Sequence, residues 1–311
     1  MLGIQKGFNL YYIYAIIERY ATMFENLISG WKLGSAIRKL VFKDKRLFLF
    51  PVLAGILIGI EAIAVFGSMF YLGYFTSPLA IALLFLYYII VYFTSVYILI
   101  AMFISFRGFM AKKPISFSAA MSKAASYKLL ILEWAVFEGI VTMIIRAIEQ
   151  RLGPIGSAIF GFGASLAMGL ATAFAVPVIV DKKTGPISTI KESTAFIIHN
   201  FGKTFGGLIY SELYSLIFSA IGIILIVAAA LVLGSVPTAV ATAIGVVGLV
   251  LLVYGIILGY ILSNIYRFVL YDYKNGGVLP EGISKEMINS SIRQKKSAAR
   301  FGFGGSGGRV V

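Results

Sequence analysis

The chain has 311 residues, of which 59% are hydrophobic and only 13% are charged. Soluble domains carry about 25% charged residues, so this composition excludes a soluble globular protein and indicates that lipid surrounds much of the chain. The absence of cysteine and the single histidine exclude disulfides, thiolate metal sites and histidine-rich metal sites. Because the basic residues behind the net charge of +14 flank apolar runs, we expect anionic lipid head groups as partners and no nucleic acid.

The N-terminal unit, residues 1–46, is predicted to form amphipathic helices at the membrane interface. Apolar residues recur at steps of three and four along 8–28, and the tyrosines of this stretch suit the head-group region. A second apolar face, with lysine and arginine around it, is formed by Leu33, Ile37, Leu40 and Val41.

Six stretches are long and apolar enough to cross a bilayer, which takes about 20 mostly apolar residues. They are 47–75, 79–106, 129–148, 152–180, 205–233 and 239–266. A glycine and a proline at Gly234 and Pro237 separate the last two. The sequence therefore predicts an all-α fold, in which residues 47–297 form a polytopic transmembrane helical bundle of six spans arranged as three hairpins.

The connections between the spans alternate between basic and charge-poor segments. Those after the first, third and fifth spans are short, contain proline and hold few or no basic residues. The other two connections hold five and four basic residues, and each terminal segment holds eight. Since basic connections stay on the cytoplasmic side, we predict a multi-pass protein of the cell membrane with both termini in the cytoplasm.

A turn signal with a candidate serine N-cap recurs after the second, fourth and sixth spans. The serines are Ser116, Ser188 and Ser284. Each turn opens a mixed polar and apolar segment, which predicts interfacial helices on the cytoplasmic face at 117–128, 189–203 and 285–297. These segments are either copies of an internal repeat or similar loops that all need turns and positive charge. The glycine-rich stretch 298–311 is predicted to be a disordered tail.

Three short signatures stand at the start, middle and end of the membrane domain. The first runs from Trp31 to Leu47-Phe48-Leu49-Phe50-Pro51, the second from Val176-Pro177-Val178 to Ser193, and the third from Leu270-Tyr271-Asp272 to Ile283. Together they make residues 31–292 resemble a family of uncharacterised, six-span polytopic membrane proteins from archaea and bacteria. The resemblance implies a six-span α-helical fold and implies no activity.

Charged side chains inside a bilayer are costly and usually have a partner or a wet cavity. Five lie inside the predicted spans: Glu61, Glu133, Glu138, Arg146 and Glu212. At about 100° per residue, Thr142, Arg146 and Glu149 fall within about 80° of Glu138, on one polar stripe of a helix. The sequence therefore predicts a polar face on the third span.

Two interpretations of these charged residues remain open. Glu61, Glu138 and Glu212 could line a proton or cation pathway. Alternatively, the carboxyl groups form hydrogen bonds between neighbouring helices and fix their orientation, while Arg146 reaches the interface and pairs with Glu149.

Basic residues beside the predicted spans are candidates for contact with anionic lipid, since each lysine or arginine near the surface contributes about 1 kcal/mol of attraction. They are Lys43, Lys45, Arg46, Lys112, Lys113, Lys182, Lys183, Arg293, Lys295 and Lys296. Their alternative role is to set the topology alone.

Sequence motifs for catalysis are missing: there is no nucleotide loop, no zinc-protease histidine pair and no Ser–His–Asp set. We therefore expect no enzymatic activity, no catalytic or metal site and no cofactor. The surface helices favour a scaffold or membrane-organising role, in a homo-oligomer or a larger membrane assembly. The intramembrane carboxylates favour the alternative, a small transporter or channel.

The predicted topology places Lys113 and Lys183 on the same, cytoplasmic side of the membrane. Because the chain contains no cysteine, Lys113→Cys and Lys183→Cys each introduce the only thiol. We expect both thiols to react with an impermeant maleimide only after the inner face is made accessible. Labelling of the two positions from opposite sides would contradict the six-span topology.

Overall fold

The structure is a computed structural model that describes residues 28, 30–74, 77, 79–286 and 288, with the backbone alone for 199–207. The described part is all-α. Residues 30–43 form a helix. The elements that follow are η1 (Lys45–Phe48), α2 (Leu49–Tyr71), α3 (Leu79–Met110), α4 (Phe117–Ala124), η3 (Ala125–Tyr127), α5 (Lys128–Glu149), α6 (Pro154–Ala171), α7 (Ala175–Lys182), α8 (Pro186–Val232) and α9 (Thr238–Lys274).

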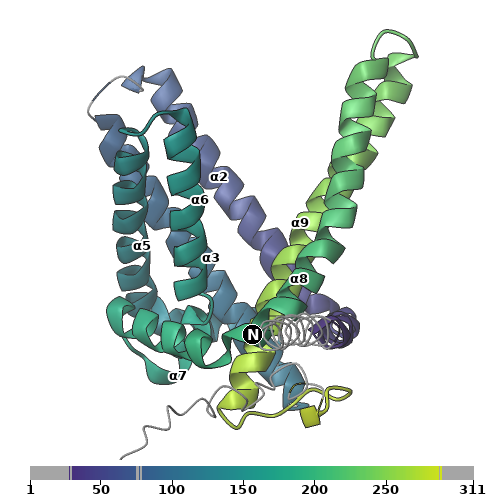
Figure 1. The fold of residues 1–311 in the computed structure, drawn as a ribbon. Coiled ribbons are helices and arrows are strands. Elements are labelled where there is room, and N and C mark those ends of the chain that lie inside the picture. The colour runs from purple at the N-terminus through teal and green to yellow at the C-terminus, as the bar shows by residue number, and fades with distance from the viewer. Residues whose placement is uncertain (1–27, 29, 75–76, 78, 287, 289–311) are drawn as a thin grey trace, which may run out of the picture.

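The helices converge at one end of the molecule and diverge toward the other (Figure 1). The α8–α9 hairpin forms one arm, α3, α5 and α6 form the other, and α2 runs obliquely from the tip of the second arm to the converging end. The turns at 72–74, 150–153 and 233–237 lie at the diverging, charge-poor end. The basic connections lie at the converging end, which we call the basic end.

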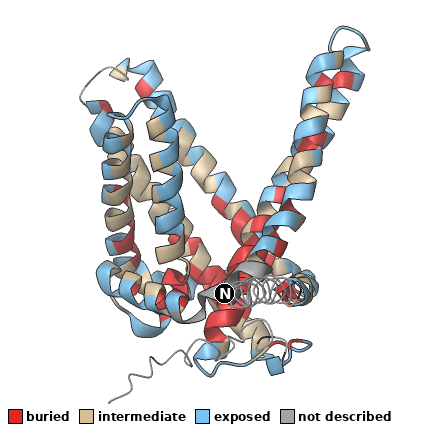
Figure 2. Ribbon diagram, viewed as in Figure 1, coloured by how far each residue is buried: buried red, intermediate tan, exposed pale blue. Residues whose placement is uncertain are grey.

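The core is concentrated at the basic end, where buried residues gather in Figure 2. It is built around large side chains that are almost completely buried, among them Phe103 and Phe106 of α3, Phe174, and Tyr266 and Phe268 of α9. Toward the diverging end, α8 and α9 expose many isoleucine, leucine and valine residues. A lipid environment accounts for this exposure, since it removes the hydrophobic penalty that water would impose.

Five helical segments in the described part of the chain are long and apolar enough to cross a membrane. They are Lys45–Tyr71, Leu79–Met110, Pro154–Lys182, Leu208–Val232 and Thr238–Lys274. The predicted third span, 129–148, is the helix α5, but its charged residues keep it outside this set.

Two predicted boundaries differ from the structure. The segment 189–203, predicted as a separate interfacial helix, is the first part of α8, which continues for 47 residues into the fifth predicted span. The fourth predicted span is instead broken at 172–174 into α6 and α7. At this break the Phe174 amide donates a hydrogen bond to Ser193 Oγ of α8 at 3.1 Å, so that the break and the base of α8 hold each other in place.

The predicted apolar face of the N-terminal region is buried by protein rather than by lipid. Leu33, Ile37 and Val41 on helix 30–43 are completely buried and belong to the main core. The helix α4 likewise buries Ala120 and Ala124, and Ser116 caps it by accepting a hydrogen bond from the Ala119 amide at 3.2 Å. These helices therefore pack against the bundle through their apolar faces.

Other predictions for surface segments lie outside the described residues. They concern the helix at 8–28, most of the helix at 285–297 and the tail at 298–311. In the turns after α3 and α7, Lys112 and Lys183 both have left-handed φ angles, of 56° and 50°.

The α8–α9 hairpin depends on glycine at the contact between the two helices. A Cβ on Gly222 would lie 2.5 Å from the Leu252 amide nitrogen and 2.6 Å from the Gly248 carbonyl oxygen. Two helices can approach this closely only where small residues face each other. The glycines Gly255 and Gly259 of α9 face Ser215 in the same way, so they pack within the chain.

We therefore expect Gly222→Ala to force α8 and α9 apart and to destabilise the protein by about 1–3 kcal/mol, the usual effect of overpacking. The matched control is Gly59→Ala on α2, where no atom lies within 4 Å of the added methyl group. Resistance to unfolding in sodium dodecyl sulfate measures both variants. Equal behaviour of the two variants would contradict a close α8–α9 contact.

Candidate functional site

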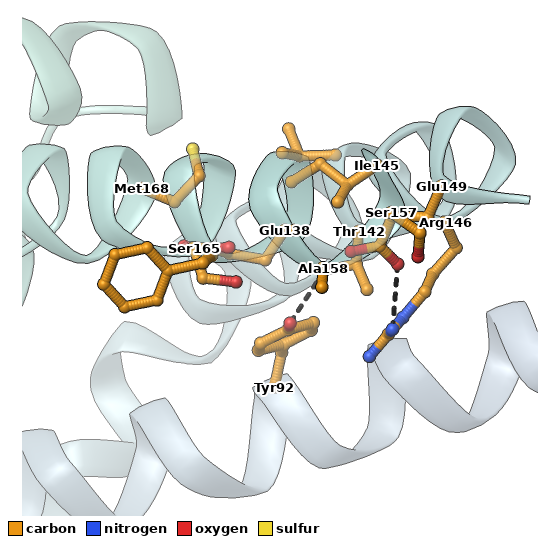
Figure 3. A pocket seen from close by; sticks show the side chains of 13 residues that line it. Tyr92, Glu138, Thr142, Ile145, Arg146, Glu149, Ser157, Ala158, Ser165 and Met168 are labelled. Atoms are coloured by element: carbon orange, nitrogen blue, oxygen red, sulfur yellow. Dashed lines mark hydrogen bonds and ion pairs between the residues drawn. The ribbon is translucent and has the colours of Figure 1, made fainter. Parts of the chain in front are cut away.

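A cavity of about 500 Å³ lies between α3, α5 and α6 (Figure 3). We call it the α3–α5–α6 cavity. Its polar lining consists of Tyr92 from α3, Glu138, Thr142, Arg146 and Glu149 from α5, and Ser157 and Ser165 from α6. The other side chains that line the cavity are apolar and include Ile145, Phe162 and Met168. The structure thus gathers seven polar side chains between helices that are otherwise strongly apolar.

Helical spacing explains why these side chains share one cavity. On α5, steps of four and three residues carry the polar stripe from Glu138 through Thr142 and Arg146 to Glu149, as the sequence predicts. On α6, Ser157 and Ser165 are eight residues apart and fall on the same face. Gly161 lies between them, and a side chain there would overlap the Glu149 carboxylate.

Two interactions between side chains organise the cavity. The hydroxyl groups of Tyr92 and Thr142 share a hydrogen bond of 2.7 Å, which joins α3 to α5. Arg146 Nη1 donates to Glu149 Oε2 at 2.9 Å. Glu138 and Ser165 lie at one end of the cavity, and the Arg146–Glu149 pair lies at the other (Figure 3).

Glu138 is the one acidic residue of the lining without an ion pair. Among the described residues it has no hydrogen-bond partner either, although it is partly buried. Glu149 is neutralised by Arg146, so the lining as a whole has one net negative charge when Glu138 is ionised. This charge sits in the middle of α5, where a polar or cationic ligand would find an acceptor and a set of hydroxyl groups.

Glu61 lies on the opposite side of α3 from this cavity. Its Oε1 accepts a hydrogen bond of 2.6 Å from Thr94 Oγ1, and its Oε2 is buried without a partner in the described structure. Tyr92 and Thr94 are two residues apart on α3, and two residues correspond to a rotation of about 200° on an α-helix. The helix α3 therefore separates Glu61 from Glu138.

The other two carboxylates occupy further sites. Glu212 of α8 accepts a hydrogen bond of 2.7 Å from Ser263 of α9, with the Arg267 side chain near enough to interact electrostatically. Glu133 is exposed near Gly185, at the basic end. The structure does not bring Glu61, Glu138 and Glu212 together into one pathway, and Glu61 and Glu212 match the predicted interhelical hydrogen bonds.

An ion-pair cluster that the sequence analysis did not predict joins three helices at the basic end. Arg107 of α3 binds Asp181 of α7 through Nη1 and Nη2, at 2.5 and 2.8 Å. The same guanidinium binds Asp272 of α9 through Nε at 3.1 Å and Nη2 at 2.5 Å. It also lies over the Phe103 ring, 4.1 Å from the centroid. One arginine thus holds α3, α7 and α9 together.

The basic residues proposed for lipid contact are mostly exposed at the basic end. Lys43, Lys45, Lys112, Lys113 and Lys183 are exposed, and Lys182 is exposed but paired with Glu192 at 2.6 Å. Arg46 is partly buried and binds Asp44 at 2.9 Å. The predicted contacts at Arg293, Lys295 and Lys296 lie outside the described residues. No group of three potential metal ligands occurs in the part of the chain that is described.

The fold and the apolar helices define the class of the molecule: an all-α protein with several helices suited to a membrane, consistent with a multi-pass membrane protein. Residues 78–280 match DUF6159, a family of unknown function, and the chain belongs to this family. The matched region includes the α3–α5–α6 cavity and the Arg107 cluster, but not the predicted signature at Trp31–Pro51. No curated protein and no solved structure matches the chain.

We expect Arg107→Met to destabilise the protein by about 1–3 kcal/mol, because the buried carboxylate of Asp272 and the partly exposed carboxylate of Asp181 lose their shared partner. Asp272 is only 8% exposed and Asp181 is 30% exposed, so Asp272→Asn should weaken the fold more than Asp181→Asn. The comparison variant is Arg146→Met, which removes an arginine that is 58% exposed from a local pair.

Unfolding in sodium dodecyl sulfate measures all four variants. If Arg107→Met proved no more harmful than Arg146→Met, the cluster would not hold the three helices together.

Proposed function

We propose that the protein is a six-span membrane protein, with both termini in the cytoplasm, that binds a small polar or cationic solute in the α3–α5–α6 cavity and moves it across the membrane. The observation that carries the proposal is the unpaired carboxyl group of Glu138 in a polar cavity halfway along a membrane helix. A buried ionisable group of this kind is expected to serve a substrate or ion path.

The position of α5 supports the sixth span. Gly139 of α5 lies against Phe85 and Ile89 of α3, where an added Cβ would lie 3.2 Å from Ile89 and 3.4 Å from Phe85. The Tyr92–Thr142 hydrogen bond joins the middles of the same two helices. Since α5 packs along the length of α3, a bilayer crossed by α3 is also crossed by α5. Glu138, Arg146 and Glu149 of α5 then line the cavity, while Glu133 lies at the basic end.

The cavity has unequal ends. Arg146, with an exposed fraction of 58%, stands at the charge-poor end with Glu149. Between Glu138 and the basic end, α5 buries Trp134, which is 3% exposed, and Ile131, which is completely buried. We infer that solute enters from the charge-poor, extracellular side as far as Glu138, and that the packed basic end closes the path to the cytoplasm in this conformation.

The size and charge of the cavity support a small cationic solute. Ligand sites of about 300–1,000 Å³ hold small molecules, and the volume of about 500 Å³ falls in this range. The net negative charge of the lining favours a cation over an anion. The hydroxyl groups of Ser157 and Ser165 supply further hydrogen bonds to a polar solute.

The test is flux of small organic cations, or of protons, into proteoliposomes. We expect Glu138→Gln to lower the flux at least about tenfold, since it removes the charge that stabilises the bound cation. Glu61→Gln is the matched control, because Glu61 lies in a span but on the other side of α3. Equal flux through the parent protein and Glu138→Gln, with both folded, would remove the transport hypothesis.

A second proposal, a scaffold role in a larger assembly, is favoured by the α8–α9 hairpin. Its outer part exposes apolar side chains, including Leu216, Ile224 and Leu231 on α8. Lipid or a second protein copy could cover them. The burial of the apolar faces of helix 30–43 and α4 removes one reason for this role. Mass measurement in nanodiscs distinguishes the cases: a defined oligomer supports the scaffold, and a monomer without membrane partners opposes it.

A further inference from the structure

We propose that the row of lysines on helix 30–43 forms a binding site for a phosphomonoester group at the basic end of the molecule. A cavity of about 580 Å³ lies between this helix and the turn at Glu281 and Gly282. The helix lines it with Trp31, Lys32, Ser35, Ala36, Lys39, Leu40 and Lys43. This cavity is separate from the α3–α5–α6 cavity, and the inference does not depend on transport.

Helical spacing produces the site. Lys32, Lys39 and Lys43 are separated by seven and four residues, which puts their side chains on one face of the helix. Ser35 stands between the first two and adds a hydroxyl group. Three like charges in one row repel one another, so the helix alone would disfavour this arrangement. An anion bound between the lysines turns the repulsion into attraction.

The helix presents this row on a fixed support. Its opposite face is buried completely at Leu33, Ile37 and Val41. A Cβ on Gly34 would lie only 2.5 Å from the Tyr210 ring of α8, so the helix lies directly on that ring. Next to it, the Trp31 ring meets Tyr210 edge to face at 4.7 Å between centroids. The lysines therefore stand on a rigid surface, so that binding of a ligand costs less conformational entropy of the protein.

The charges of the cavity match a phosphomonoester. Lys32, Lys39 and Lys43 form no ion pair with any described residue, while Glu281 on the far wall contributes one negative charge. Three positive charges and one negative charge leave a net charge of +2. A phosphomonoester carries about −1.5 to −2 at pH 7, whereas a phosphodiester carries only −1, so the site favours the doubly charged group.

The surroundings indicate two sources for such a group. Helix 30–43 is followed by Lys45 and Arg46, which begin the segment Lys45–Tyr71 that is long and apolar enough to cross a membrane. The half-exposed indole of Trp31 suits the head-group region. The site can thus take the head group of a phosphatidic acid-like lipid, or a soluble phosphate ester such as glycerol phosphate. The same chemistry recognises both.

Trp31 offers a direct measurement, because the chain has only two tryptophans and Trp134 is 3% exposed. In a Trp134→Phe background, the full-length protein is placed in nanodiscs, and quenching of Trp31 by brominated phosphatidic acid is compared with quenching by brominated phosphatidylcholine. We expect phosphatidic acid to quench at lower mole fraction. Glycerol phosphate that reverses the quenching at low concentration would identify the soluble ester as a ligand as well.

The site variant is Lys32→Gln/Lys39→Gln/Lys43→Gln, and the matched control is Lys123→Gln/Lys128→Gln/Lys191→Gln, which spares the lysines predicted to contact anionic lipid. The control removes the same charge from exposed lysines at the same end. We expect the site variant to lose at least about tenfold in affinity for phosphatidic acid and the control to lose less than about threefold. Equal losses, or no preference for phosphatidic acid together with no effect of glycerol phosphate, would overturn the proposal.

Discussion

The shared ion pair of Arg107 is the interaction on which the arrangement of the helices depends. Three helices contribute one charged group each: Arg107 from α3, Asp181 from α7 and Asp272 from α9. A guanidinium has donors on two edges of a plane, and here both edges are used by carboxylates. The core concentrates around this point, and helices that meet there are free to diverge at the other end.

The acidic residues of the membrane helices fall into two kinds with different physical roles. Glu61 and Glu212 accept hydrogen bonds of 2.6 and 2.7 Å from hydroxyl groups on adjacent helices, and such bonds orient one helix against another. Glu138 faces a cavity and has no such donor among the described residues. A carboxyl group that fixes packing needs a partner within the protein, whereas one that binds a solute must be left available. Glu61 and Glu212 therefore differ from Glu138 in having a hydroxyl donor on a neighbouring helix.

The sequence predicts what depends on local pattern. The polar stripe from Glu138 to Glu149, the cap at Ser116 and the turn before Pro237 follow from helical spacing and turn chemistry, and the structure has all three. The sequence cannot show which residues meet in space. In the sequence, Asp181 and Asp272 are isolated acidic residues among basic ones. Only the fold brings them to Arg107. Likewise, the apolar face at Leu33 fits lipid and protein equally well, and the bundle decides between them. The helix α8 passes Gly206 and Gly207 unbroken, although glycine weakens helices.

Because α8 is long and unbroken, a small tilt at one of its ends displaces the other end by a large distance. Its 47 residues extend for about 70 Å, more than twice the thickness of about 30 Å of a bilayer interior. Its base is fastened to Phe174, directly beyond the helix that carries Ser157 and Ser165. A tilt of about 5° at this base would move the far tip by about 6 Å. Small displacements at the basic end can thus be magnified into large sideways movements at the diverging end.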